Sequence, residues 1–216
     1  MKICTLCPRM CAVDRKSGER GICGQTTEIK VARAALHFWE EPCISGEMGS
    51  GAVFFSGCAL HCVFCQNENI ANGTAGKVIS TERLGEIFLE LQEKGANNIN
   101  LVTPGQFVPQ IIKAVELARN QNLKIPIVYN TSSYENVDTI RSLEGIVDIY
   151  LPDFKYFDTA LSAKYSHAPD YPAVAKAVIA EMVRQTGAAV FENGEDSLMK
   201  RGTIVRHLIL PGCTAL

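Results

Sequence analysis

The stretch FFSGCALHCVFCQN, residues 54–67, places Cys58, Cys62 and Cys65 close together in the spacing CxxxCxxC. A structural zinc site is closed by four ligands, and iron–sulfur clusters are ordinarily held by four cysteine thiolates. Three thiolates on one loop therefore leave a metal position open for a substrate or cosubstrate. The alternative is a zinc site that His61 or a distant ligand completes, since thiolates suit zinc as well as iron–sulfur clusters.

Outward from this loop, short apolar runs alternate with segments of helical periodicity. The apolar runs predict buried strands, at residues 51–57, 98–102, 125–130, 147–154 and 202–210. Apolar residues three and four positions apart predict the helices between them, at residues 80–95, 107–121, 134–145 and 171–187. Strands that alternate with helices are typical of a parallel α/β sheet, either open or closed into a barrel.

The carboxyl ends of the strands are the expected place for a binding site. In open parallel sheets and in barrels, ligands bind at this edge. The three-cysteine loop follows the first predicted strand there. We expect the turns after the later strands, which begin TPGQ, NTSSY, PDFKY and PGC, to gather around it. The polar segment 187–202 is predicted to be a surface loop.

The first fifty residues show little periodicity, apart from a candidate strand at 29–36. We predict a Cys-rich metal-binding module over residues 1–50 and a catalytic domain over 51–216. Four thiolates in the module suit a closed zinc site or a four-iron cluster, and they belong to Cys4, Cys7, Cys11 and Cys23. An iron–sulfur cluster is favoured because the adjoining domain is expected to bind one. Cys43 and Cys213 stand alone and are expected only to pack.

Composition excludes several classes of protein. The net charge is −2 over 216 residues, so no broad basic face is expected for nucleic acid. No apolar run is long enough for a membrane helix, and the first residues do not resemble a signal peptide. These features predict a cytoplasmic protein without membrane contact. Its nine cysteines are then expected to be reduced, and clustered reduced cysteines indicate metal or redox chemistry.

The cysteine spacing after a first strand resembles the radical S-adenosylmethionine (SAM) superfamily. The segments GERGICG, NINLVTP, VDIYLPDFKY and RHLILPG resemble its branch of pyruvate formate-lyase activating enzyme homologues, and the resemblance extends over residues 1–212. It implies a partial parallel (βα) barrel with five of the family's six units. It also implies a [4Fe–4S] cluster on the three-cysteine loop, with SAM at the open iron.

The resemblance further implies an activity. A radical SAM enzyme, an oxidoreductase, reductively cleaves SAM to a 5′-deoxyadenosyl radical that abstracts hydrogen. The branch indicates a glycyl radical enzyme as the protein substrate, and flavodoxin or ferredoxin as the reductant. Two alternatives stay open, namely a different substrate and a non-catalytic iron–sulfur or zinc module for electron transfer or assembly.

Residues outside the cysteines are assigned to SAM by the same resemblance. These are Phe64, Asn67, Thr103, Asn130, Asp153, Lys155 and Arg206. Thr103 lies where the family often has GGE, so this turn departs from the pattern and is equally an ordinary turn. Asp153 and Lys155 match the DxK pair of the activating enzymes, with a surface ion pair as the alternative. Asn130 is equally a simple cap.

The end of the chain leads to a further expectation. Arg206 stands inside the fifth apolar run and must face a partner or water, whereas His207 is expected to face the other way. No sixth strand or covering helix follows the fifth run, so its edge is expected to be bare. We therefore expect a C-terminally truncated chain that is prone to aggregate and weakly active or inactive.

Overall fold

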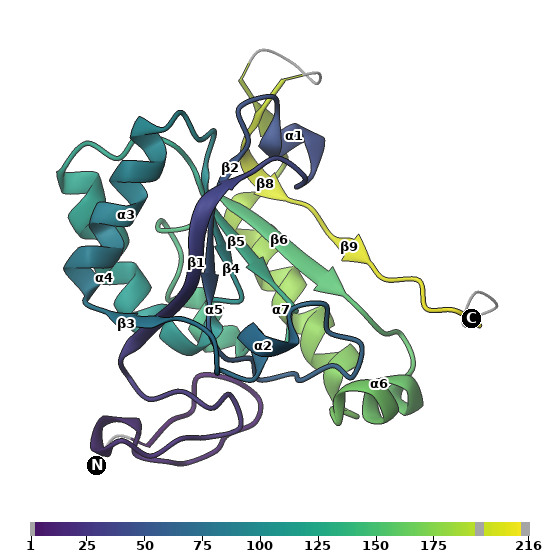
Figure 1. Cartoon of the computed structure of the whole chain (residues 1–216). Helices are drawn as coiled ribbons and strands as arrows, with labels where there is room; N and C mark the ends of the chain where they lie inside the picture. The colour runs from purple at the N-terminus through teal and green to yellow at the C-terminus, as the bar shows by residue number, and fades with distance from the viewer. Residues whose placement is uncertain (1–2, 193–196, 213–216) are drawn as a thin grey trace.

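The computed structural model describes residues 3–192 and 197–212 of the chain. Its centre is one sheet in which β2, β4, β5, β6 and β8 run parallel (Figure 1). The parallel strands span Ser50–Phe55, Ile99–Val102, Ile127–Thr131, Ile149–Phe154 and Met199–Thr203. The strand order agrees with the predicted α/β class and with a partial barrel of parallel strands.

Helices cover one face of this sheet and form the main core with it. They are α3 (Thr81–Glu93), α4 (Val108–Asn120), α5 (Val137–Arg141) and α7 (Tyr171–Thr186). Ser80 caps α3, because its side chain accepts a hydrogen bond from the Arg83 backbone amide. Alternate strand residues such as Val53, Leu101 and Tyr129 point into this core.

The other face of the strands is apolar at one end and polar at the other. Val128, Ile149 and Leu151 pack there against Ile44 of the short helix α1 (Pro42–Ser45). Asn130 and Asp153 follow on the same face, one strand period further along β5 and β6. The interior is thus sealed by α1 at the amino ends of the strands and lined by polar groups at their carboxyl ends.

Two predictions about residues 187–210 are wrong. The predicted surface loop contains β7 (Val190–Phe191) and most of β8, which pair antiparallel, while residues 193–196 lie outside the described part. The predicted strand at 202–210 is divided, because β8 ends at Thr203 and only Arg206–His207 form β9, beside β6. Polar residues are tolerated in β8 because it lies near the edge of the sheet.

The edge of the last parallel strand is also less bare than expected. β7 covers β8 at Met199 and Arg201. The helix α6 (Thr159–Ser166), which the periodicity did not indicate, lies beyond β6. Whether the chain is truncated stays a prediction.

The remaining helices are short. They are α2 (Glu68–Ala71), η1 (Arg15–Ser17) and η2 (Gly105–Phe107).

The predicted N-terminal module contributes a strand to the main sheet. β1 (Ile29–His37) pairs antiparallel with β2 on one side and with β3 (Lys77–Ile79) on the other. The candidate strand at 29–36 is therefore confirmed. The segment before β1 lies at the carboxyl ends of the parallel strands (Figure 1). The division of domains at residue 50 stays a prediction.

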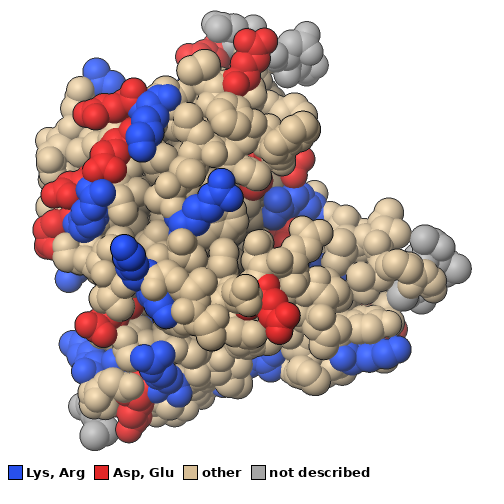
Figure 2. Space-filling view, in the orientation of Figure 1, with Lys and Arg blue, Asp and Glu red and all other residues tan. Residues whose placement is uncertain are grey.

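The described helices and the charges on the visible face of the molecule bear on a membrane span and a basic face. None of the helices in the described residues is long and apolar enough to cross a bilayer. Figure 2 shows basic and acidic side chains interspersed over the visible face. This mixture agrees with the net charge of −2.

Candidate functional site

The cysteine loop leaves β2 through Ser56 and Gly57. Gly57 has φ of +87°, and a Cβ atom there would overlap the Cys23 carbonyl oxygen and lie 2.5 Å from Gln25 Cγ. Only glycine fits such a left-handed and crowded position without strain. The N-terminal segment is thus packed directly against the start of the loop.

Further contacts hold the loop from outside. Arg9 Nε donates to the Ala59 carbonyl at 2.9 Å, and the His61 ring nitrogen Nε2 lies 2.9 Å from the Ile22 carbonyl. On α6, the Ser166 hydroxyl donates to Cys62 Sγ at 3.0 Å. His61 faces the N-terminal segment, so the described arrangement does not support the alternative in which it completes a zinc site.

One cavity of about 630 Å³ brings the predicted site together. Its wall includes all three cysteines of the loop. It also includes every residue assigned to SAM from the sequence, namely Phe64, Asn67, Thr103, Asn130, Asp153, Lys155 and Arg206. These residues come from the cysteine loop, from the ends of β4, β5 and β6, and from β9. Their roles as ligands stay predictions, but their convergence is a feature of the structure.

Arg206 connects three elements across this cavity. Its Nε donates to Asp153 Oδ1 at 2.8 Å, and its Nη2 donates to Asn130 Oδ1 at 2.7 Å. Lys155 Nζ donates to the other oxygen of Asp153 at 2.6 Å. The Asp153–Lys155 pair is therefore largely enclosed in the cavity rather than a surface ion pair. His207 lies outside the cavity wall, exposed, with its ring beside Phe154, as expected.

The turn after β4 stabilises the start of the cysteine loop through the side chain of Gln106. Thr103 has φ of +55°, which is rare for a β-branched residue and marks a strained position. Gln106 Nε2 lies 2.9 Å from the Ser56 carbonyl, 3.0 Å from that of Gly57 and 2.9 Å from that of Thr103. Gln106 was not predicted as a site residue, because a side chain that binds distant carbonyls has no local signature.

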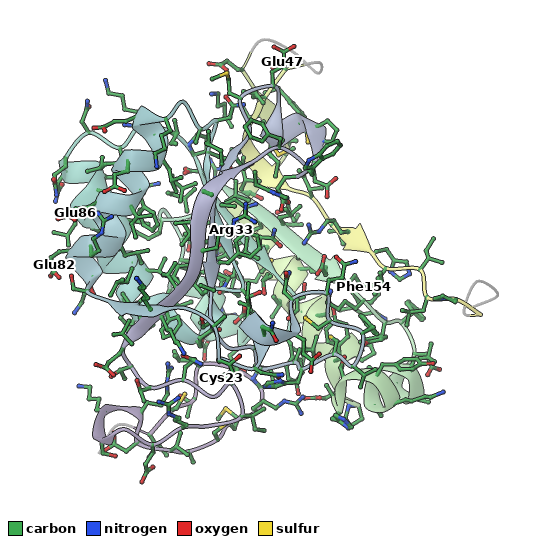
Figure 3. The ribbon with its side chains drawn as sticks, in the orientation of Figure 1. Cys23, Arg33, Glu47, Glu82, Glu86 and Phe154 are labelled. Atoms are coloured by element: carbon green, nitrogen blue, oxygen red, sulfur yellow. The ribbon has the colours of Figure 1, made fainter. Side chains whose placement is uncertain are left out.

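Three more residues of the cavity wall come from the N-terminal part of the chain. They are Arg33 and His37 of β1, with Glu40 just beyond it. Figure 3 shows Arg33 on β1, in front of the parallel strands. Burial raises the pKa of Glu40, and the nearby Arg206 and His37 offset part of that effect. These residues were not predicted, because only the pairing of β1 with β2 brings them to the cavity.

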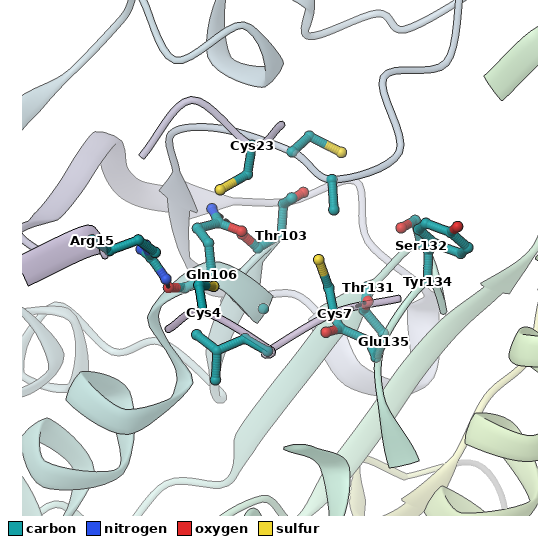
Figure 4. A pocket seen from close by; sticks show the side chains of 14 residues that line it. Cys4, Cys7, Arg15, Cys23, Thr103, Gln106, Thr131, Ser132, Tyr134 and Glu135 are labelled. Carbon is teal, nitrogen blue, oxygen red and sulfur yellow. Dashed lines mark hydrogen bonds between the residues drawn. The ribbon is translucent and has the colours of Figure 1, made fainter. Parts of the chain in front are cut away.

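A second, adjoining cavity is lined by three of the four N-terminal cysteines. Cys4, Cys7 and Cys23 line it with Arg15 and Glu135 (Figure 4). Cys58 and Thr103 line both cavities, so the two share a wall. Burial raises the pKa of Cys7 to about 12 and that of Cys58 to about 11. Binding of a metal to either thiol therefore releases a proton.

The donor set fits an iron–sulfur cluster with SAM beside it. Three thiols and a row of charged and amide groups line the same cavity. Among residues 3–192 and 197–212, no three His, Cys, Asp or Glu side chains converge on a single ion position. Cys58, Cys62 and Cys65 would hold the cluster.

The fold and the site define a class of protein, and the chain belongs to it. The model of the radical SAM superfamily matches residues 52–185, which run from β2 through the cysteine loop and the strands β4, β5 and β6 into α7. This superfamily implies a [4Fe–4S] cluster, SAM and enzymatic function. The chain is also 27% identical over 217 residues to an uncharacterized protein of Methanocaldococcus jannaschii. The match covers 97% of this chain and 57% of that protein.

Proposed function

We propose that this chain is the SAM-cleaving core of an enzyme that removes a hydrogen atom from a glycine of a partner protein. The observation that carries the proposal is the convergence of the cysteine loop with Asp153, Lys155 and Arg206 in one cavity. When bound, the cluster and SAM supply a 5′-deoxyadenosyl radical by reductive cleavage. The chain itself binds SAM, orients it and shields it from water.

The residues of the cavity have distinct tasks in this proposal. The Thr103 hydroxyl accepts a hydrogen bond from the ammonium group of SAM. Asp153 and Asn130 orient Arg206, which faces the carboxylate or ribose of SAM. Phe64 makes edge contacts with Tyr156 and Tyr165, at 6.2 and 6.3 Å between ring centroids, which keep the loop rigid.

The choice of a glycine as substrate has narrower support. Gln66 and Asn67 follow the last cysteine and line the cavity, as does the Asp153–Lys155 pair. Both features resemble the activating enzymes of glycyl radical enzymes. A flavodoxin or ferredoxin is the proposed source of the electron.

A cleavage assay tests both parts of the proposal, the cleavage of SAM and the choice of a glycine as substrate. The chain is reconstituted anaerobically with iron and sulfide, reduced and mixed with SAM and candidate partner proteins that contain deuterated glycine. We expect 5′-deoxyadenosine that carries deuterium, and none from a variant with Cys58, Cys62 and Cys65 changed to Ala. Cleavage without label from any glycine would exclude the glycyl substrate. A cluster-loaded chain that leaves SAM intact would exclude the radical SAM activity itself.

A further inference from the structure

The four N-terminal cysteines form one group in space, although Cys11 and Cys23 are well separated along the chain. Cys4, Cys7 and Cys23 line the same cavity, and Figure 4 shows their side chains around it. Cys11 Sγ accepts a hydrogen bond from the Ile22 backbone amide, 3.4 Å away and next to Cys23. The chain therefore folds back to bring the four thiols near one another, so that Cys7 and Cys23 both interact electrostatically with Cys11.

Backbone amides point at three of these sulfurs. The Arg9 amide donates to Cys7, the Ile22 amide to Cys11 and the Gln25 amide to Cys23. The predicted cluster ligand Cys58 has the same feature, since its sulfur accepts from the Leu60 amide at 3.4 Å. Amide hydrogen bonds to cysteine sulfur are among the features that set the properties of iron–sulfur centres.

A buried cation in the same cavity lacks an anionic partner. Arg15 is 5% exposed, and its guanidinium donates only to the carbonyls of Gln25, Gln106 and Thr26. No carboxylate of the described residues forms an ion pair with it. A buried charge is costly unless it is compensated. Thiolates bound to a metal centre supply the missing negative charge.

Two kinds of centre take four thiolates. Four sulfurs around zinc lie about 2.3 Å from one point. A cluster binds each thiolate through a different iron atom and also contains sulfide, so sulfide analysis separates it from zinc.

We propose that Cys4, Cys7, Cys11 and Cys23 hold a second iron–sulfur cluster, which fixes the N-terminal segment against the catalytic cysteine loop. The segment contacts the loop at three points. Its residues 22–25 lie against Gly57 and His61, and Arg9 binds the Ala59 carbonyl. The second cluster closes the chain around these contacts and so supports the first site.

Metal analysis and Mössbauer spectroscopy of the reconstituted full chain test this proposal. We expect two clusters in the unsubstituted chain, which corresponds to about eight iron atoms if both are four-iron clusters. The variant with Cys58, Cys62 and Cys65 changed to Ala should keep about half of the iron and sulfide. The double variant Cys7→Ser with Cys23→Ser should lose about half. Its residues 56–67 should also exchange amide hydrogen faster.

Cys43→Ser is the matched control, because Cys43 packs beside Ile44 and belongs to neither cavity; it should keep all the iron. Zinc without sulfide in the triple Ala variant would overturn the proposal, and so would the absence of any metal there. That variant decides the question even if the double Ser variant fails to fold. Two clusters without SAM cleavage would count against the proposed function and leave this inference standing. SAM cleavage with a single cluster would support the proposed function and overturn this inference.

Discussion

The side-chain amide of Gln106 links three backbone carbonyls at the entrance of the cysteine loop. We expect Gln106→Ala to lower the free energy of unfolding by about 1–3 kcal/mol, because buried carbonyls lose their donor. It should also reduce the iron retained on the loop. Urea denaturation and iron analysis measure both effects. Gln110→Ala is the control, since Gln110 binds only the Thr27 carbonyl, away from the loop. Equal losses in the two variants would contradict the role of Gln106.

Gly57 combines a left-handed backbone with close neighbours, and a matched glycine separates the two effects. Gly145 has φ of +78°, but a Cβ atom added there would meet no other atom within 4 Å. We expect Gly145→Ala to cost about 1–2 kcal/mol from backbone strain alone. Gly57→Ala should cost about 1–3 kcal/mol more, because its Cβ overlaps the N-terminal segment. Thermal or urea unfolding gives both values, and a similar cost at the two positions would refute the close packing of that segment.

Arg206 is held by Asp153 and Asn130, so changes at this network should alter SAM binding. We expect Arg206→Ala and Asp153→Asn to weaken SAM binding at least about tenfold, the effect of losing one charged hydrogen bond. Equilibrium binding of SAM to the cluster-loaded chain measures this. His207→Ala should leave the affinity unchanged, because His207 lies outside the cavity wall. Undiminished affinity in both network variants would remove these residues from the site.

At the scale of elements, the end of α6 supports the cysteine loop beside Arg9 of the N-terminal segment, which donates to the carbonyls of Ser166 and His167. Ser166, near its end, is fully buried and donates to Cys62 Sγ. We expect Ser166→Ala to lower SAM cleavage about tenfold, in the range for residues that support metal ligands. It should also make the reduction potential of the cluster more negative, because a hydrogen bond to sulfur is lost.

Ser162→Ala on the same helix is the matched control. Ser162 is also fully buried, but its hydroxyl donates to the Thr159 carbonyl within the helix and binds no cysteine. The potential should therefore stay unchanged in this variant. A shift of the potential in both variants would point to a general loss of packing rather than to the sulfur contact.

At the scale of the whole molecule, the core of the sheet does not depend on the segment before β1, whereas the cysteine loop does. Every residue of the main core lies at or after Ile29. Removal of residues 1–28 should therefore leave the sheet folded but free the cysteine loop from Arg9, Ile22 and Gln25. Hydrogen exchange should rise in residues 56–67 and stay slow in β4 and β5. Unchanged protection of the loop would contradict this dependence.

The length of the chain, compared with that of a related protein, also belongs to this scale. It spans 57% of the length of the M. jannaschii relative that it matches. The activity, partners and substrate of the whole protein are therefore proposals.

The sequence by itself determined most of the elements of the sheet and most of the candidate site. Apolar periodicity depends on local spacing, so it predicted α3, α4, α7 and the first four parallel strands. Parallel strands bring their carboxyl ends to one edge, so residues such as Asn130, Asp153 and Lys155 were predicted to meet the cysteine loop. The cysteine spacing indicated the chemistry, because it lies within a single loop.

Only the tertiary structure decided what depends on contacts between distant segments. The antiparallel pairing of β1 with β2 brings Arg33 and Glu40 into the cavity, and no local pattern encodes that register. The bonds from Gln106 to Ser56 and from Arg9 to Ala59 each join residues about fifty positions apart. The strands β7 and β8 form in a polar stretch because they stabilise each other at the edge of the sheet. Local periodicity shows on which face of a helix or strand a residue lies. Pairing between distant segments decides what that face contacts.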